Sequence, residues 1–485
     1  MIPSDSDERM SNMIGRKDES RVLLRALSRN ESQFVAVYGR RRVGKTYLIR
    51  KTFANNFAFY HTGIFDGSYR EQLEEFKESL EECGLSDCPH LGNWRDAFRE
   101  LRRLLESKPD GKKVVFIDEL PWMDTRNSRF VQQFDKFWNK WASARDDIVL
   151  VACGSAASWM IKNVINDYGG LHNRITDSIS VKPFTLKECE EYANEQGLSM
   201  SRREVAECYM VFGGIPYYWS YLEKGQSLAQ NIDRLIFAED GKLRNEFGRL
   251  FKSLFREDRM HREVIESLGR RKSGKTREEI LADVSFHDSG KFSECLRSLE
   301  ECGFIRAFVA IGKVTKDTMF QLVDNFTLFH LEFLADKSDA QAGFWTSTVT
   351  APIQISWRGR AFERLCLAHI EQIKAALGIS GVQTRVNSWT HSPTKEHPEG
   401  AQIDLLIDRA DNVINLCEMK YSHGEYSLTP TECDRLLHRR DVFVAVTGTK
   451  KSVHLTMVTP NGVVESPERH VLQSEVTLDD LFRNV

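Results

Sequence analysis

Eight residues near the N-terminus have the types and spacing needed to hold a nucleotide phosphate. Residues 39–46 read Gly-Arg-Arg-Arg-Val-Gly-Lys-Thr, which fits the pattern GxxxxGK(S/T). The two glycines let the backbone approach phosphate oxygens without a Cβ in the way, and the amide N–H groups of such a loop form a positive cradle. In this pattern Lys45 reaches the β- and γ-phosphates and the Thr46 hydroxyl ligates Mg²⁺. The pattern predicts a phosphate-binding P-loop.

The segments beside the loop are those that such a site needs. Residues 33–38 form a short apolar run that predicts a buried parallel strand. Residues 47–51 suit the first turn of a helix, whose N-terminus adds to the positive field. Strand, glycine loop and helix together favour a nucleotide site over a basic surface turn. The residues that we expect to bind the nucleotide here are Gly39, Arg42, Val43, Gly44, Lys45, Thr46 and Tyr47.

Two acids follow the next apolar run. Residues 114–117 are Val-Val-Phe-Ile, and Asp118 and Glu119 come directly after them. This is typical of a buried strand that ends at a nucleotide site, the Walker B element. Asp118 would hold Mg²⁺ through water, and Glu119 would polarise the attacking water as a general base. The alternative is that the two acids only cap a strand in solvent.

Two further segments resemble motifs of AAA-related ATPases. Residues 13–16, Met-Ile-Gly-Arg, precede a helical stretch and resemble the Ile-Gly-Arg box that packs by the adenine. Residues 147–153 predict another buried strand, followed by Gly154 and Ser155. The resemblance implies that this strand lies between the P-loop and Walker B strands and that Ser155 senses the γ-phosphate. The alternative is that Gly154 and Ser155 simply begin a turn.

The first half of the chain as a whole resembles the archaeal-type STAND ATPase family. Gly214-Ile215-Pro216 interrupts a helical pattern and is similar to the Gly-x-Pro motif of the STAND lid, where the proline lies near the adenine. The P-loop and Walker B residues carry the resemblance. Arg174 could supply positive charge to a γ-phosphate within its own subunit or across an interface, although a solvated arginine is an equal alternative.

A second match to GxxxxGK(S/T), at residues 269–276, is interpreted as a coincidence. The segment before it has helical periodicity and acids that a central strand would not bury. Thr276 with Glu279 three residues later predicts a helix N-cap with a capping box. Three expected helices, at residues 262–268, 277–284 and 291–302, precede an alternating hairpin at 303–323, which predicts a winged-helix module. Its third helix carries the bases Lys291 and Arg297 but also three acids, Glu294, Glu300 and Glu301, so we favour a protein contact over DNA contact.

The C-terminal part contains a second set of residues suited to chemistry. Residues 401–408 and 413–420 predict a β-hairpin with Asp404 on one strand and Glu418-x-Lys420 on the other. Period two puts Glu418 and Lys420 on one face. Asp404 and Glu418 would converge on Mg²⁺ or Mn²⁺, Lys420 would stabilise the transition state, and Glu363 on a preceding helix would bind or support the metal. The chemistry suited to this set is metal-assisted phosphodiester hydrolysis.

This constellation resembles the PD-(D/E)xK nuclease superfamily. Ile403 stands where that pattern often has proline. The alternative is a surface strand with an acid opposite a Glu–Lys pair. The apolar neighbours of these acids indicate strands that are buried on at least one face. Burying a carboxylate costs free energy unless it is paired or binds a metal, which favours a functional role for these acids.

The composition limits the class of protein and the number of domains that the chain can form. The chain has 485 residues, 41% hydrophobic and 28% charged, as in a globular protein of several domains. A net charge of −3 gives no global basic signature. The scattered cysteines and the lack of a bilayer-spanning run predict a cytoplasmic protein without a membrane partner. The expected fold is an α/β P-loop core with helices on both faces of a parallel sheet (1–180), a helical lid (181–255), the winged-helix module (256–336) and an α/β PD-(D/E)xK-like domain (353–485).

Together the motifs predict an ATP-binding and ATP-hydrolysing switch that controls a metal-dependent DNA nuclease. ATP and Mg²⁺ are the expected cofactors, with Mn²⁺ possible at the nuclease site. The expected partners are nucleic acid, DNA rather than RNA, and further copies of the chain. The family resemblance implies a role in defence against foreign DNA. Two alternatives stay open: an ATP-dependent regulator whose C-terminal domain binds nucleic acid or protein without cutting, and an oligomerising signalling protein that binds nucleotide without turnover.

Overall fold

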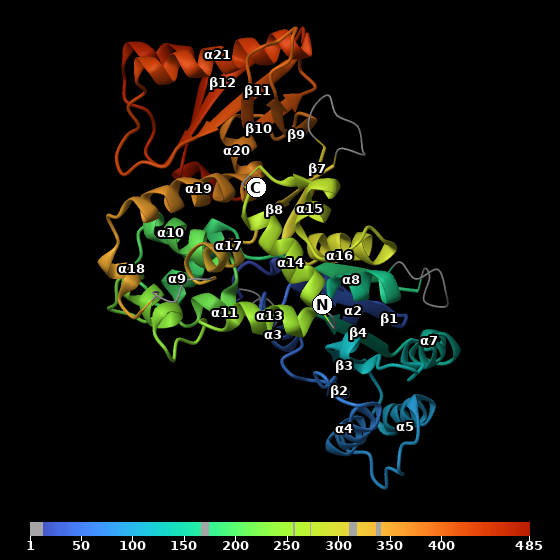
Figure 1. The fold of residues 1–485 in the computed structure, drawn as a ribbon. Helices are drawn as coiled ribbons and strands as arrows, with labels where there is room; N and C mark the ends of the chain where they lie inside the picture. The colour runs from blue at the N-terminus through green and yellow to red at the C-terminus, as the bar shows by residue number, and fades with distance from the viewer. Residues whose placement is uncertain (1–12, 166–173, 256–257, 272, 310–317, 336–340) are drawn as a thin grey trace. The chain divides into compact units, whose positions relative to one another are not determined.

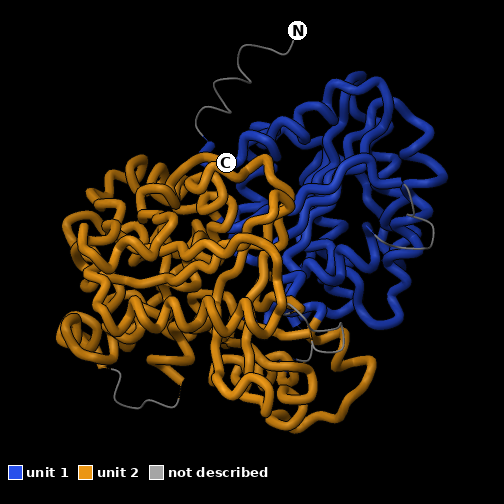
Figure 2. Tube along the Cα trace, turned by 90° about the horizontal axis from the view of Figure 1, so that it is seen from above, with its two compact units in different colours: residues 1–183, 250–258, 297–302 blue, residues 184–249, 259–296, 303–485 orange. Residues whose placement is uncertain are grey.

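A computed structural model describes residues 13–165, 174–255, 258–271, 273–309, 318–335 and 341–485 (Figure 1). The chain divides into two compact units, coloured separately in Figure 2. The first unit contains residues 1–183, 250–258 and 297–302, and the second contains residues 184–249, 259–296 and 303–485. Each unit is described by itself below.

A five-stranded parallel sheet forms the centre of the first unit. Its strands are β1 (Gln33–Tyr38), β2 (Phe59–Thr62), β3 (Lys113–Asp118), β4 (Ile148–Gly154) and β5 (Asp177–Ser180), in the order β2-β3-β4-β1-β5. Every residue of β3 and β4 is buried, as the continuous apolar runs predict. β4 lies between β1 and β3, so the strand order implied by the AAA resemblance is confirmed.

Helices cover both faces of this sheet. Alternate strand residues such as Phe34, Ala36 and Val115 pack in one apolar cluster with α4 (Tyr69–Glu82), α5 (Trp94–Ser107) and α7 (Phe130–Lys140). Phe116 points to the opposite face, where its ring lies 5.4 Å from that of Phe57. The helices α2 (Lys17–Ser28) and α3 (Lys45–Thr52) pack against each other, and Phe53, directly after α3, packs against Phe57 on this second face. The predicted α/β core with a parallel sheet is confirmed.

An ion-pair cluster closes the amino ends of β3 and β4. The Asp147 carboxylate accepts hydrogen bonds from Arg145 Nε (2.7 Å) and Nη2 (2.7 Å) and from Lys113 Nζ (2.6 Å). The bonds from Arg145 are the main cause that holds the pKa of Asp147 well below its usual range. A carboxyl group with a depressed pKa stabilises the fold while it is ionised, and this contribution is lost as the pH falls through the pKa of the folded state.

Replacing Asp147 with asparagine is therefore expected to lower the free energy of unfolding at pH 7 by about 1–3 kcal/mol. The difference from wild type should shrink as the pH falls below about 4, where the carboxyl of the unfolded chain becomes protonated. Urea unfolding followed by circular dichroism at several pH values measures both effects. The exposed neighbour Asp146→Asn is the matched control. A difference between Asp147→Asn and wild type that is absent, or unchanged at low pH, contradicts this assignment.

The second unit begins with the segment that the sequence predicts as a lid. It contains α9 (Leu186–Glu195), α10 (Arg202–Phe212), α11 (Pro216–Trp219) and α12 (Leu228–Ile232). Capping boxes begin α9, α10 and α12, at Thr185, Ser201 and Ser227. α13 (Glu246–Leu254) follows. The lid role itself stays a prediction.

The middle of the chain contains the elements expected of the winged helix. They are α14 (Asp258–Gly269), α15 (Arg277–Asp283) and α16 (Gly290–Glu301), with a small antiparallel sheet of β6 (Lys275–Thr276), β8 (Met319–Leu322) and β7 (Ile305–Phe308). Helix α14, rather than a strand, precedes the second GxxxxGK(S/T) match. Thr276 caps α15 in a capping box with Glu279, as predicted. The winged-helix class and its role stay predictions.

The C-terminal part contains a five-stranded mixed sheet, in the order β13-β12-β11-β10-β9. β9 (Thr384–His391), β10 (Ala401–Arg409) and β11 (Val413–Met419) are antiparallel neighbours, while β12 (Ser452–Thr459) and β13 (Ser474–Thr477) continue in parallel from β11. The predicted hairpin is therefore present. α17 (Asn325–Phe333), α18 (Phe344–Ser347), α19 (Pro352–Ala368) and α20 (Ile370–Ala376) precede the sheet, and α21 (Pro430–Thr447) follows β11.

The expected domain bounds leave residues 337–352 unassigned, between the winged-helix module and the C-terminal domain. In the structure α18 lies within this stretch, and α19, the helix that carries Glu363, begins at Pro352. Proline suits the first turn of a helix because an N–H there would have no helical partner.

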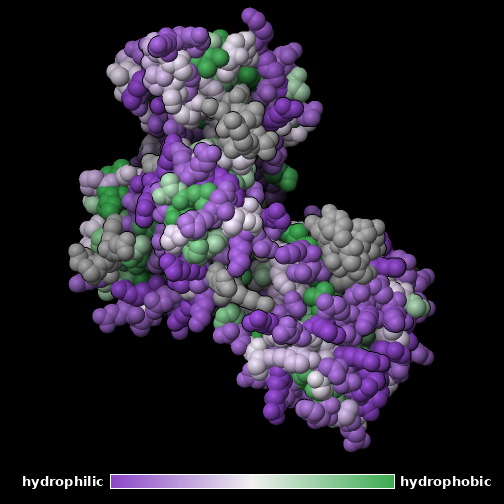
Figure 3. Space-filling view, turned by 45° about the vertical axis from the view of Figure 1, so that its right-hand side comes forward, coloured by the Kyte–Doolittle hydropathy of each residue, from purple (hydrophilic) through white to green (hydrophobic). Residues whose placement is uncertain are grey.

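Within the described ranges no helix has the length and apolarity needed to cross a bilayer. The face drawn in Figure 3 is largely hydrophilic, with hydrophobic residues in small separate groups.

Candidate nucleotide site and C-terminal acidic residues

The P-loop connects the end of β1 to the start of α3. Gly39 has φ +145°, and a Cβ on it would lie 2.3 Å from the Val181 carbonyl oxygen. Gly44 has φ +93° and is the N-cap of α3. Side chains other than hydrogen are disfavoured at both positions, so the two glycines of the pattern are needed for this loop conformation. Arg42 also has positive φ, at 73°.

Lys45 is the buried cation at the centre of the loop. Its Nζ donates to the carbonyl oxygens of Gly39 (3.0 Å) and Arg40 (3.0 Å) and to Ser155 Oγ (3.1 Å). Ser155 follows β4 and is itself buried. The P-loop cation and the predicted γ-phosphate sensor are therefore in direct contact. Because Ser155 Oγ accepts a hydrogen bond from Lys45, both groups could reach the same phosphate.

Oxygen atoms suited to Mg²⁺ lie beside this cation. Thr46 Oγ1 donates to Asp118 Oδ2 at 2.7 Å, and the other carboxylate oxygen of Asp118 accepts from the Glu119 amide at 2.9 Å. A hydroxyl and a carboxylate are hard ligands of the kind that Mg²⁺ prefers. The positive-φ glycines, the buried Lys45 ammonium and this donor pair fit a nucleotide with its Mg²⁺ ion.

Glu119 is held in a constrained position directly after β3. Its φ is 46°, which is uncommon for a residue other than glycine. Its carboxylate accepts from the Ser155 amide at 3.0 Å and from the Ser155 hydroxyl. A Cβ on Gly154 would lie 2.8 Å from Pro121 Cδ, so glycine allows the residues just after Glu119 to pack against the end of β4. The candidate base, sensor and cation thus form one chain of contacts across β3, β4 and the P-loop.

Arg16 ties the Ile-Gly-Arg segment to the loop. Its Nη2 donates to the carbonyl oxygens of Val43 (3.1 Å) and Lys182 (2.7 Å), and the residue is only 5% exposed. The segment expected beside the adenine therefore holds the backbone of the P-loop and of the residues after β5. Adenine contact by this segment stays a prediction.

Three further residues predicted to bind the nucleotide take no part in the contacts between Lys45, Ser155 and Glu119. Tyr47, on the first turn of α3, is 54% exposed. Arg174 is exposed shortly before β5, and its neighbours 166–173 lie outside the described residues. Pro216 begins α11 in the second unit, after Gly214, whose carbonyl oxygen accepts from the Phe184 amide at 2.6 Å. The nucleotide roles of these three residues stay predictions.

In the C-terminal domain, a β-bulge decides the direction of Asp404. β9 pairs with β10 through Ile403↔Trp389 and Leu406↔Asn387, so the register shifts between Ile403 and Leu406. Ile403 and Leu406 both belong to the apolar cluster that includes residues of α21. Asp404 instead lines a cavity of about 180 Å³ on the α19 side of the sheet, together with Glu363.

Glu418 and Lys420 belong to a different cavity. They lie on one face, as the alternation predicts, and Lys420 Nζ is 2.7 Å from Glu418 Oε1. The other Glu418 oxygen accepts from Arg439 Nη1 of α21 at 2.7 Å. This cavity, of about 50 Å³, lies on the α21 side and does not include Asp404. The structure thus places Glu363 and Asp404 at one cavity and Glu418 and Lys420 at another. It does not bring all four predicted residues together in a single site.

Two arginines that the sequence did not single out contribute to the Asp404 cavity. They are Arg306 of β7 and Arg364 of α19. Burial is the main cause that lowers the pKa of each to about 10. Among the described residues no cluster of three or more His, Cys, Asp or Glu side chains is suited to a metal ion. Arg306 and Arg364 are far apart in the sequence and become neighbours only in the fold, so no local sequence pattern could have predicted their place at this cavity.

The comparison with family models agrees with the nucleotide site. Residues 13–222 match the family described as an ATPase domain predominantly from Archaea. The match supports an archaeal-type ATPase domain over these residues, which make up less than half of the chain. The match covers the P-loop, the Walker B acids, Ser155 and Pro216, while the C-terminal sheet lies outside it.

The chain is also similar to one further protein sequence and to several solved structures. An uncharacterised protein of Methanocaldococcus jannaschii is 24% identical over 404 residues, which cover 81% of this chain and 83% of the relative. The Walker-type ATPase paby2304 of Pyrococcus abyssi has a TM-score of 0.47 at 19% identity and covers 66% of this chain and 96% of its own. The ORC2 protein of Aeropyrum pernix has a TM-score of 0.39 at 14% identity and covers 67% of this chain and 96% of its own.

Proposed function

We propose that the chain is an ATP-hydrolysing switch whose nucleotide state controls its C-terminal domain. The observation that carries the proposal is the contact chain Lys45–Ser155–Glu119 at the carboxyl ends of three parallel strands. Ligands of open α/β sheets bind outside these strand ends. Family membership of the domain supports ATP as the nucleotide.

Each residue of this contact chain, and the Mg²⁺ ligands beside it, has a definite part in the proposal. Lys45 exchanges its two loop carbonyls for β- and γ-phosphate oxygens. Ser155 donates its hydroxyl to the γ-phosphate, and Glu119 then accepts a proton from the attacking water. Thr46 and Asp118 would hold Mg²⁺, which supplies charge neutralisation at the phosphates when it is bound. When the γ-phosphate leaves, Ser155 returns to Glu119.

The nucleotide state has a short covalent route into the second unit. Lys182, whose carbonyl oxygen accepts from Arg16, is two residues from Phe184, whose amide donates to Gly214. A shift of the P-loop backbone held by Arg16 would therefore pull on the chain that enters the predicted lid. Two positions of this lid, one for ATP and one for ADP, are the switch that we propose.

Metal-dependent DNA cleavage is the second candidate function, for the C-terminal domain. Glu363 and Asp404 favour it because their carboxylates share a polar cavity with Arg306 and Arg364, which could contact phosphate. A three-acid site also needs Glu418, which lines another cavity, so cleavage requires a rearrangement of the bulged strand. A DNA-binding regulator that does not cut is the competing proposal. Assembly of several copies and a defence role remain parts of the nuclease proposal.

The nuclease proposal predicts Mg²⁺- or Mn²⁺-dependent DNA cleavage by the purified full chain. Lys420→Ala should lower the cleavage rate by at least about a hundredfold, because a cation that stabilises the transition state is lost. The exposed lysine variant Lys450→Ala is the matched control. Gel assays with DNA and RNA substrates, with and without ATP, measure the effect. DNA binding without cleavage under every nucleotide condition favours the regulator instead.

A further inference from the structure

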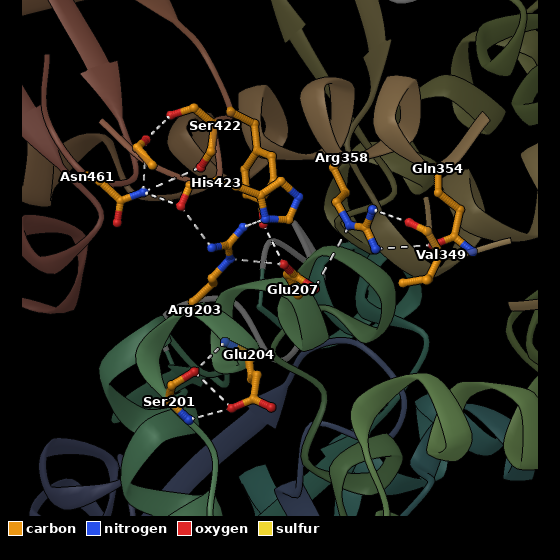
Figure 4. A network of polar contacts seen from close by, with 12 residues as sticks. Ser201, Arg203, Glu204, Glu207, Val349, Gln354, Arg358, Ser422, His423 and Asn461 are labelled. Carbon is orange, nitrogen blue, oxygen red and sulfur yellow. Dashed lines mark hydrogen bonds and ion pairs between the residues drawn. The ribbon is translucent and has the colours of Figure 1, made fainter. Parts of the chain in front are cut away.

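A polar network in the second unit joins the predicted lid to the segment that follows Lys420 (Figure 4). Its centre is Glu207 on α10. Tyr421 OH donates to Glu207 Oε1 at 2.5 Å, and Arg203 Nε lies 3.4 Å from the same oxygen. Arg358 Nε, from α19, is 3.9 Å from Glu207 Oε2. One carboxylate therefore faces two guanidinium groups and one hydroxyl from three separate parts of the unit.

Arg203 makes a second set of contacts with the same segment. Its Nη1 donates to the His423 carbonyl oxygen at 3.0 Å, its Nη2 contacts His423 Nδ1, and its guanidinium lies 5.8 Å from the centre of the Tyr421 ring. These contacts hold both the backbone and the side chains of the segment against α10. Because α10 presents Arg203 and Glu207 one turn apart, a rotation of the helix displaces both together.

The segment is also fixed on its other sides. The Tyr421 ring packs 5.7 Å from that of Phe362 on α19. Asn461, which follows β12, donates from Nδ2 to the carbonyl oxygens of Ser422 (3.4 Å), His423 (3.3 Å) and Gly424 (3.2 Å). Burial is the main cause that raises the pKa of Tyr421 well above its usual value, so its hydroxyl stays protonated as a donor. Movement of α10 is thus transmitted to a segment with little freedom of its own.

The network connects helix α10, near the entry to the predicted lid, with Tyr421, beside the C-terminal motif. Tyr421 comes directly after Lys420 and three residues after Glu418, the acid of the C-terminal motif. Helix α10 ends at Phe212, and Gly214 just beyond it accepts from Phe184 at the entry to the unit. Helix α10 therefore has the lid entry just beyond its C-terminal end and, through Glu207 and Arg203, contacts the segment after the strand that carries the C-terminal motif.

We propose that Glu207 and Tyr421 form a latch through which the lid passes the nucleotide state to the end of β11. This inference deepens the proposed ATP switch and rests on it. Glu207 and Tyr421 are positioning residues: they orient the backbone after Lys420 and contact neither nucleotide nor nucleic acid. The latch assigns a path of control that holds whether the C-terminal domain cuts nucleic acid or only binds it.

Hydrogen–deuterium exchange on the full chain tests the latch without a nuclease assay. Wild type is compared with and without a non-hydrolysable ATP analogue, and peptides covering residues 39–52 and 420–426 are followed. We expect the analogue to change the exchange rate at least twofold in both peptides. In Tyr421→Phe and in Glu207→Gln the change at 39–52 should persist and the change at 420–426 should disappear. The double variant should match either single variant, because both remove the same contact.

Tyr221→Phe is the matched control, since the Tyr221 hydroxyl donates to Tyr217 OH within residues 184–249. It should keep both changes. Tyr421→Phe retains the ring that packs on Phe362, so it carries the test even if Glu207→Gln is unstable. A response at 420–426 that survives in Tyr421→Phe, or that is absent in wild type while 39–52 responds, overturns the latch and leaves the ATP switch standing. No response at 39–52 in wild type overturns the proposed function itself.

Discussion

Glu119→Gln is expected to abolish ATP turnover while ATP binding is retained. The amide cannot accept a proton from water, and loss of a general base lowers kcat by about 10²–10⁴-fold. The substitution keeps the shape of the side chain, and the glutamine oxygen can still accept from the Ser155 amide. The cradle around Lys45 should therefore stay intact. Steady-state phosphate release measures turnover, and equilibrium binding of a fluorescent ATP analogue measures affinity.

The control for this variant is Glu78→Gln, an exposed acid of α4 that carries the same change of charge. It should leave turnover at the wild-type rate. Two results are incompatible with Glu119 as the base: turnover of Glu119→Gln within about threefold of wild type, or loss of ATP binding together with turnover.

Lys45→Ala is expected to affect binding as well as turnover. Lys45 is the buried cation that the P-loop wraps, and its Nζ makes three hydrogen bonds, two of them to loop carbonyls. Removing one preorganised donor from a site of developing charge lowers kcat by about 10²–10³-fold. Because Lys45 is also expected to contact phosphate in the ground state, the ATP affinity should fall as well.

Lys51→Ala on the same helix is the matched control. Lys51 is exposed, and its ammonium lies over the Tyr47 ring 5.7 Å from the centroid. It carries the same charge as Lys45 but does not enter the loop. Isothermal titration with ATP and phosphate-release assays compare the two variants. Equal effects of Lys45→Ala and Lys51→Ala would mean that Lys45 acts only as general positive charge and would remove the basis of the assigned site.

The nucleotide site could be predicted from the sequence because its parts are local. The glycines, Lys45 and Thr46 lie within eight consecutive residues, and Asp118 and Glu119 directly follow a run that can only be a buried strand. In a parallel sheet the carboxyl ends of strands meet at one edge, so local motifs at those ends converge. Ser155 was predicted from the resemblance to AAA-related ATPases, and the structure brings it into contact with Lys45.

The C-terminal site was less predictable because it depends on register. Strict alternation on β10 and β11 would set Asp404 opposite Glu418 on one face. The bulge between Ile403 and Leu406 turns Asp404 towards α19 instead. A signal was present in the sequence, since the adjacent apolar pair Leu405-Leu406 breaks the alternation.

Contacts between distant segments could not be predicted from patterns. Glu207 and Tyr421 are separated by more than two hundred positions, and neither belongs to a motif. Arg306 and Arg364 come close to Asp404 only because β7 and α19 meet at one cavity. Hydrophobic periodicity indicates which face of an element is buried, but it does not name the partner.

The most direct test of the ATP switch is the nucleotide bound to purified protein after incubation with Mg²⁺ and ATP. Wild type and Glu119→Gln are passed over a desalting column, and the retained nucleotide is identified by ion-exchange chromatography. We predict ADP on wild type and close to one intact ATP per chain on Glu119→Gln. Retention of no nucleotide by either protein, or of ADP by both, would contradict an ATP-hydrolysing site built from Lys45, Ser155 and Glu119.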